Sequence, residues 1–172
     1  DVKSSGWTWY ATGPGVGIEL KGEKYRGRLV VPCDHANAKT RKYHAHVIYS
    51  DDHGKTWRRG KPTAEGANEC QVVELTDGRV LLNCRNYNRQ WKCRSITYSD
   101  DGGESWSDFR YDEVLVEPIC QASLIALPDH PRTLVFSNPA DTEDRLRLTV
   151  RLSDDEGNTW KNALEVHRGP AA

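Results

Sequence analysis

Five polar side chains of this sequence could do chemistry together: Asp34, Glu69, Arg85, Gln121 and Arg145. A glutamate can take up a proton as a general base, and arginine guanidinium groups bind carboxylates through paired hydrogen bonds. Glu69 and Arg85 lie 16 positions apart with a turn signal between them. A hairpin of that length brings its two ends together, so we expect these two side chains to be neighbours.

A repeated octet shows how the chain around these residues is organised. It reads Ser-x-Asp-x-Gly-x-Ser/Thr-Trp and occurs at 50–57, 99–106 and 153–160. The spacing of about 50 residues suits a four-stranded propeller blade. The third-position Asp can accept bonds from its own turn, the Gly can take a positive φ, and the Trp can fill space and donate its indole N–H. We interpret these octets, called Asp boxes below, as structural and not catalytic.

Strand patterns surround each Asp box in the same order. In the first copy, short apolar or alternating segments lie at 17–20, 28–32 and 44–49, and a more polar segment follows the Trp. Helical periodicity is absent nearly everywhere. The sequence therefore predicts an all-β fold with three four-stranded antiparallel meanders. The blade units run roughly over 13–66, 67–117 and 118–168, within one domain that covers 1–172.

Propeller geometry explains why the polar residues should meet. The innermost strand of each blade begins near the central channel, so equivalent positions of the blades converge there. Glu69 and Gln121 lie at predicted starts of inner strands, and Asp34 and Arg85 lie at the ends of second strands. Arg145 follows in the next loop. The Asp-box turns lie at the far end of each blade.

Composition excludes several classes of function. The chain has 172 residues with 24 basic and 25 acidic side chains, which argues against a nucleic-acid partner. No apolar run of about 18 residues could span a membrane. The segment 1–5 is polar, so no signal is present in this chain, and a secreted or periplasmic location stays open. Because the chain lacks Met, we expect it to start inside a longer product.

The cysteines and histidines do not show metal-ligand spacing. The five cysteines fit no Cys-x-x-Cys pattern, and we expect buried free thiols, with a Cys84–Cys93 cross-strand bridge as the alternative. His44 and His46 alternate along one predicted strand and share one of its faces. A metal site there is the less favoured interpretation, and we expect neither a metal nor a cofactor.

Several segments carry a more specific resemblance. They are 10–18, 27–32, 68–75 (beginning Asn-Glu-Cys-Gln), 82–86 (Leu-Asn-Cys-Arg-Asn), 136–139 and 148–153. Asp boxes alone would be weak, since other propellers carry them. Together with these segments, in this order over nearly the whole chain, they resemble the central portion of the sialidase (neuraminidase) family, whose Asp boxes are also called BNR repeats.

The resemblance implies an exo-α-sialidase on a six-bladed propeller, which releases terminal sialic acid from glycoconjugates with retention. In such enzymes the nucleophile is a tyrosine. A glutamate assists it, and Glu69 matches that motif. Three arginines hold the sugar carboxylate; Arg85 matches the second. Arg145 fits the third best, with Arg147 and Arg151 as alternatives. Asp34 and Gln121 are then candidates for the pocket wall.

Three features of the family pattern are missing from this sequence. The Arg-Ile-Pro motif with the first arginine, the acid/base Asp and the tyrosine nucleophile are not in the sequence. The resemblance therefore implies about half of a propeller and part of an active site, inactive by itself. Self-association of two such chains could complete the ring. The alternative function is a non-catalytic propeller that binds carbohydrate or protein.

Overall fold

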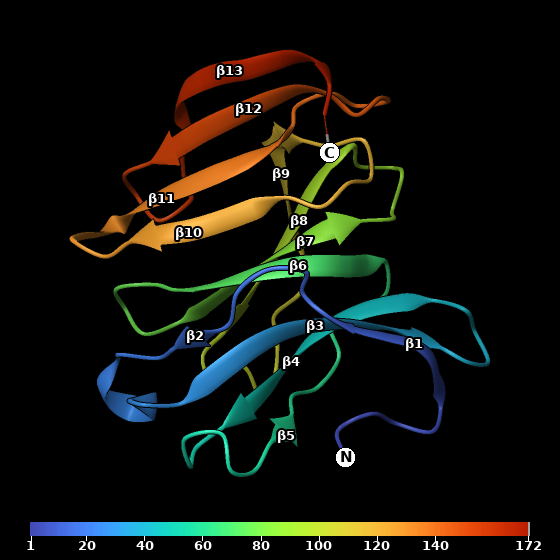
Figure 1. Ribbon diagram of the computed structural model, residues 1–172, viewed down its shortest axis with the longest axis vertical. Helices are drawn as coiled ribbons and strands as arrows, with labels where there is room; N and C mark the ends of the chain where they lie inside the picture. The colour runs from blue at the N-terminus through green and yellow to red at the C-terminus, as the bar shows by residue number, and fades with distance from the viewer. Residues whose placement is uncertain (172) are drawn as a thin grey trace.

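The computed structural model describes residues 1–171, which form three antiparallel sheets stacked along the long axis of the molecule (Figure 1). The first sheet contains β1 (Trp7–Thr12), β2 (Ile18–Glu19), β3 (Leu29–Asn37), β4 (Tyr43–Ser50) and β5 (Arg58–Arg59), with a 3-10 turn, η1 (Glu23–Tyr25). The second contains β6 (Ala67–Glu74), β7 (Val80–Asn86), β8 (Cys93–Ser99) and β9 (Arg110–Val116). The third contains β10 (Ser123–Leu127), β11 (His130–Pro139), β12 (Leu146–Ser153) and β13 (Lys161–Pro170). The all-β class and the repeated meander are confirmed.

The inner strand of the first sheet is split into two pieces. Both β1 and β2 pair with β3: β1 aligns Thr12 with Cys33, and β2 aligns Ile18 with Val30. The sequence pattern assigned this strand to 17–20 alone, because the Gly-Pro-Gly segment at 13–15 looked like its start. The structure adds β1, which lies ahead of the predicted unit 13–66 and proves important for the site.

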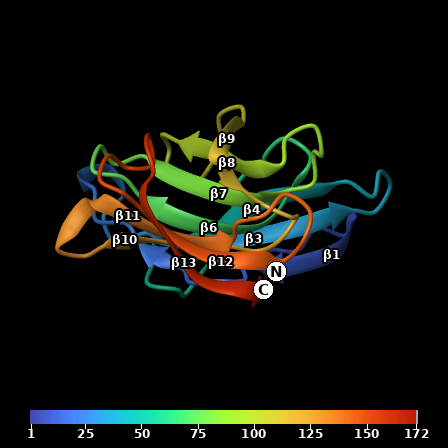
Figure 2. The same ribbon diagram turned by 90° about the horizontal axis from the view of Figure 1, so that it is seen from above.

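The second sheet is packed on both faces. On β6, Val72 belongs to the core shared with the first sheet, and its neighbour Val73 belongs to the core shared with the third. On β7, Leu82 and Leu81 divide in the same way. This explains why these strands have continuous apolar runs, since a strand buried on both faces has no polar side. Figure 2 shows β6, β7, β8 and β9 following one another outward in that order.

The Asp boxes have the predicted internal geometry. In the first, Asp52 Oδ1 accepts from Thr56 N at 2.8 Å and Asp52 Oδ2 from the Thr56 hydroxyl at 2.6 Å. The Thr56 bonds, with a further bond from Ser50, hold the pKa of Asp52 below its usual value. The fifth-position glycines have positive φ in all three boxes: 84°, 95° and 83° at Gly54, Gly103 and Gly157. The carboxylates are occupied by their own turns, as a structural role requires.

The boxes also join neighbouring sheets. Arg28 of the first sheet donates to the carbonyls of Asp101 and Gly102 in the second box, at 3.2 and 3.3 Å. Trp160 of the third box donates its indole N–H to Asp112 of the second sheet at 3.0 Å. The tryptophans differ in this respect, because Trp57 bonds within its own box and the buried Trp106 indole N–H has no partner among the described residues.

Substitution of Gly103 tests how closely the second Asp box packs against the first sheet. A Cβ at Gly103 would lie 2.7 Å from Val47 of the first sheet, whereas one at Gly78, with a similar φ, would touch nothing within 4 Å. Gly78→Ala therefore reports only the cost of a positive φ, about 1–2 kcal/mol. We expect Gly103→Ala to lower the free energy of unfolding by about 1–3 kcal/mol more, measured by urea denaturation. Equal losses in the two variants would contradict close packing of the box.

Candidate functional site

A pocket of about 200 Å³ lies between the first and second sheets and contains the predicted pair of residues. Arg85 Nη1 donates to Glu69 Oε2 at 2.5 Å. Arg85 comes from the end of β7 and Glu69 from the start of β6, so the hairpin brings its ends together as expected. Both side chains are mostly buried but accessible, at 17% and 27% exposure. This combination of access and partial burial suits groups that meet a ligand.

The strand that carries Glu69 is locally irregular. The register between β6 and β7 shifts between Ala67 and Cys70, so Asn68 and Glu69 lie in a bulge. A bulge adds a residue to one strand and turns side chains away from the regular alternation. Glu69 consequently lines the pocket, while the next residue, Cys70, packs in the core between the sheets.

Asp34 lies beside this pair and is completely buried. Its Oδ2 accepts two hydrogen bonds at 2.8 Å, one from Trp9 Nε1 and one from Asn68 Nδ2. Burial raises the pKa of Asp34 to about 6; the Trp9 bond acts in the opposite direction, and the charge of Glu69 raises it further. Asp34, Glu69 and Arg85 are therefore the three predicted residues that the structure brings together.

Aromatic side chains complete the pocket, and the sequence patterns did not single them out. Trp9 of β1 is 54% exposed at the rim. Tyr43 and Tyr87 stack with their ring centroids 5.1 Å apart, and the Arg85 guanidinium lies 5.1 Å from the Tyr87 ring. The aromatic run at 7–10 could have predicted a strand, but it lies before the first repeat unit.

Gln121 reaches the same region from the third sheet but does not line the pocket. Its Nε2 and that of Gln71 both donate to the carbonyl of Pro14, which is a pocket residue. Segments of, or next to, the inner strands of all three sheets therefore meet at one point, as expected for a propeller. Gly15 permits this approach, because a Cβ there would lie 1.9 Å from Gln71 Nε2.

Arg145 is not among the residues that line this pocket. It is exposed in the loop between β11 and β12, and its carbonyl accepts from Ala171 N at 2.7 Å. That loop lies at the same end of its sheet as the end of β7 in the second sheet, because both follow the second strand of a meander. Of the alternatives, Arg147 pairs with Glu165 at 3.0 Å, and Arg151 bonds Asn138 at 3.4 Å.

A buried ion pair holds the strand that carries Arg85. Arg94 Nη1 donates to Glu117 Oε2 at 2.5 Å, and both side chains are 0% exposed. Arg94 also bonds Asn83 Oδ1 at 2.6 Å and the Cys120 carbonyl at 2.8 Å, while Glu117 Oε1 accepts from Asn86 N at 2.6 Å. These bonds fix β7 on both sides of Arg85 and attach it to the segment that enters the third sheet.

With this geometry established, comparison with known proteins identifies the family. A model of the family described as BNR repeat-like domain matches residues 1–172. The chain belongs to the BNR-repeat sialidase family. The sialidase of Micromonospora viridifaciens is 40% identical over 162 residues, which cover 90% of this chain and 25% of that protein. Sialidase-3 of Homo sapiens is 36% identical over 138 residues, which cover 70% of this chain and 30% of that protein.

Solved structures agree with this assignment. Hadza microbial sialidase Hz136 superposes with a TM-score of 0.86 at 34% identity, covering 98% of this chain and 33% of that one. A leech intramolecular trans-sialidase, complexed with 2,7-anhydro-Neu5Ac, superposes with a TM-score of 0.73 at 26% identity, covering 95% and 26%. The three sheets are thus blades of a sialidase-type propeller. This chain spans about a quarter to a third of the length of these relatives.

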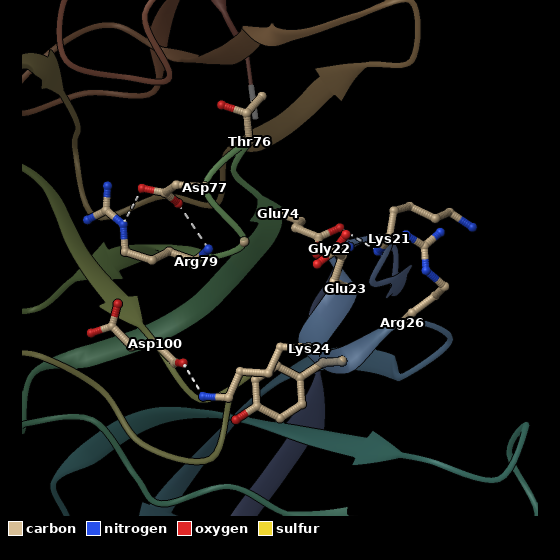
Figure 3. A pocket seen from close by; sticks show the side chains of 12 residues that line it. Lys21, Gly22, Glu23, Lys24, Arg26, Glu74, Thr76, Asp77, Arg79 and Asp100 are labelled. Carbon is tan, nitrogen blue, oxygen red and sulfur yellow. Dashed lines mark hydrogen bonds and ion pairs between the residues drawn. The ribbon is translucent and has the colours of Figure 1, made fainter.

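The opposite end of the first two blades has a different character. A hollow of about 480 Å³ lies there between η1 and the β6–β7 turn (Figure 3). Several of its charged groups are bound to one another or to backbone: Glu74 accepts from Lys21 N and Gly22 N at 2.6 and 2.8 Å, and Arg79 pairs with Asp77 at 2.7 Å. Glu74 lies five residues along β6 from Glu69, roughly 16 Å away. We interpret this end as a polar seam between blades.

The cysteines are all free and buried. The alternative Cys84–Cys93 bridge is wrong, because Cys84 aligns with Cys70 on β6 and with Ser95 on β8, while Cys93 aligns with Val116. His44 bonds the Thr63 carbonyl and His46 bonds His35, both at 3.0 Å. Within residues 1–171, no cluster of three or more metal-ligating side chains is found, and no helix is long and apolar enough to cross a membrane.

The Arg94–Glu117 pair gives a prediction of stability. Glu117→Gln removes the negative charge and leaves the Arg94 guanidinium buried without it. Breaking a buried pair in this way typically costs about 3–5 kcal/mol, and we expect a loss of that size in urea denaturation. The matched control is Glu65→Gln, which breaks the exposed Lys42–Glu65 pair and should cost less than about 1 kcal/mol. Similar losses in both variants would show that burial of the pair contributes nothing.

Proposed function

We propose that this chain forms part of the active site of an exo-α-sialidase, which releases terminal sialic acid from glycoconjugates with retention. The observation that carries the proposal is the Glu69–Arg85 pair, accessible in a pocket between two blades of a sialidase-family propeller. The relatives that the chain matches are named sialidases, from bacteria to human. Support comes from the family together with this geometry.

The two residues have complementary roles in this proposal. Glu69 acts as the base that activates a tyrosine nucleophile, which belongs to a part of the protein beyond this chain. A tyrosine hydroxyl has a pKa near 10, so at neutral pH it needs such a base. Arg85 binds the carboxylate of the sugar. A guanidinium has five N–H donors, so one bond to Glu69 leaves others for a ligand.

The remaining predicted residues contribute at the edges of the site. We propose that Arg145 supplies a further guanidinium from the third blade, where it is exposed and carries no side-chain ion pair among the described residues. Gln121 supports the pocket wall through its bond to Pro14. The first arginine, the acid/base aspartate and the nucleophile come from further blades. Self-association as a source of those blades stays a prediction.

Two substitutions test the proposal, each made in a protein with a complete propeller. Glu69→Ala should lower kcat on a fluorogenic sialoside by about 10²–10⁴-fold, because it removes the base. Arg85→Lys should mainly raise KM, because an ammonium cannot form the paired bonds that a guanidinium forms. Glu65→Ala, on the exposed Lys42 pair, is the control and should leave both constants unchanged.

The outcomes separate the candidate functions. Undiminished turnover by Glu69→Ala would contradict the catalytic role of Glu69. A protein that binds a sialoside without turnover, and whose binding depends on Arg85, would instead support a non-catalytic carbohydrate-binding propeller. Calorimetry with the sialoside distinguishes these cases.

A further inference from the structure

We propose that Asp34 is a positioning residue, whose buried carboxylate joins a bulge of the first blade to the bulge of the second blade that carries Glu69. The inference rests on the proposed function and adds a residue that acts on Glu69 without touching the sugar. It follows from three features of the structure: the contacts of Asp34, the irregular strands on either side of it, and its burial.

The contacts come from two different blades. Asp34 lies on β3, and its Oδ2 accepts from Trp9 Nε1 on β1 and from Asn68 Nδ2 on β6, both at 2.8 Å. Asn68 is 5% exposed and immediately precedes Glu69. A single oxygen atom therefore connects the rim of the pocket to the residue next to the proposed base.

Both donors lie where the sheet is irregular. The β1–β3 register shifts between Trp7 and Tyr10, and the β6–β7 register shifts between Ala67 and Cys70. A bulged residue lacks a regular ladder partner, so its backbone is held less firmly than its neighbours. Side-chain bonds to a fixed acceptor replace that restraint. The orientation of the Glu69 side chain therefore depends on Asp34, which acts through the neighbouring residue Asn68.

Burial argues that Asp34 acts through its neighbours. The side chain is 0% exposed, and its Oδ1 is buried without a partner among the described residues. A desolvated carboxylate is costly to keep charged. The charged form of Asp34 therefore depends on its two hydrogen-bond donors and on nearby charges for stabilisation. The ionisable groups whose charges interact with that of Asp34 are Glu69, Arg85, Tyr87, Cys33 and Cys70. Burial raises the pKa of Asp34 to about 6, so its charge changes in mildly acidic solution.

The kinetic test uses Asp34→Asn in a protein with a complete propeller. Because a small misplacement of a catalytic group can cost about 10²-fold, we expect kcat to fall by that factor while KM changes less than about threefold. The pH profile of kcat/KM should lose its component near pH 6, because the variant has no carboxyl group that changes charge there. Trp9→Phe should cause part of the loss. The double variant should lose little more than Asp34→Asn alone, because both changes weaken the same connection.

A spectroscopic test does not depend on turnover. The indole N–H resonance of Trp9, assigned with Trp9→Phe, should shift with a midpoint near pH 6 in the wild type, since its acceptor changes charge, and should not titrate in Asp34→Asn. A Trp9 indole resonance that does not change with pH would contradict the proposed connection between Trp9 and Asp34. A loss confined to KM would overturn the positioning role in favour of direct sugar contact. If Glu69→Ala retains turnover, the proposed function fails, while the indole titration still decides whether Asp34 joins the bulges.

Discussion

The buried ion pair between Arg94 and Glu117 is the constraint on which the site depends. Charges without exposure are stable only when paired and fully hydrogen-bonded, and this pair meets the condition through Asn83, Asn86 and the Cys120 carbonyl. Those bonds fix β7 before and after the position of Arg85 and hold the segment that leads to the third blade. The direction of Arg85 into the pocket therefore follows from an interaction that no ligand reaches.

The two ends of the blades have different roles in the structure. At the Asp-box end, the box carboxylates accept hydrogen bonds from their own turns. Arg28 and Trp160 donate hydrogen bonds that connect the boxes to neighbouring blades. At the other end, regular pairing gives way to bulges, and polar groups face a pocket. The two apolar cores between the blades lie between these ends.

The sequence predicted what is local or repeats, and it did not predict what depends on contacts between distant strands. The Glu69–Arg85 pair was predictable because both residues belong to one hairpin. The Asp-box geometry was predictable because eight consecutive residues contain it. Trp9 was missed because β1 lies outside the repeat, and Arg94 because a strand arginine gives no sign of a buried partner 23 positions away. Arg145 stays a prediction, since it does not line the pocket between the first two blades.

The charges that line the pocket are not balanced. Asp34 and Glu69 are both acidic, and among the described residues Arg85 is the only basic one that lines the pocket. An incoming carboxylate would meet more negative than positive charge when both acids are ionised. Two changes relieve this repulsion: protonation of Asp34, whose pKa burial raises to about 6, and additional guanidinium groups from other blades. The proposed contribution of Arg145 from the third blade would offset part of this local imbalance.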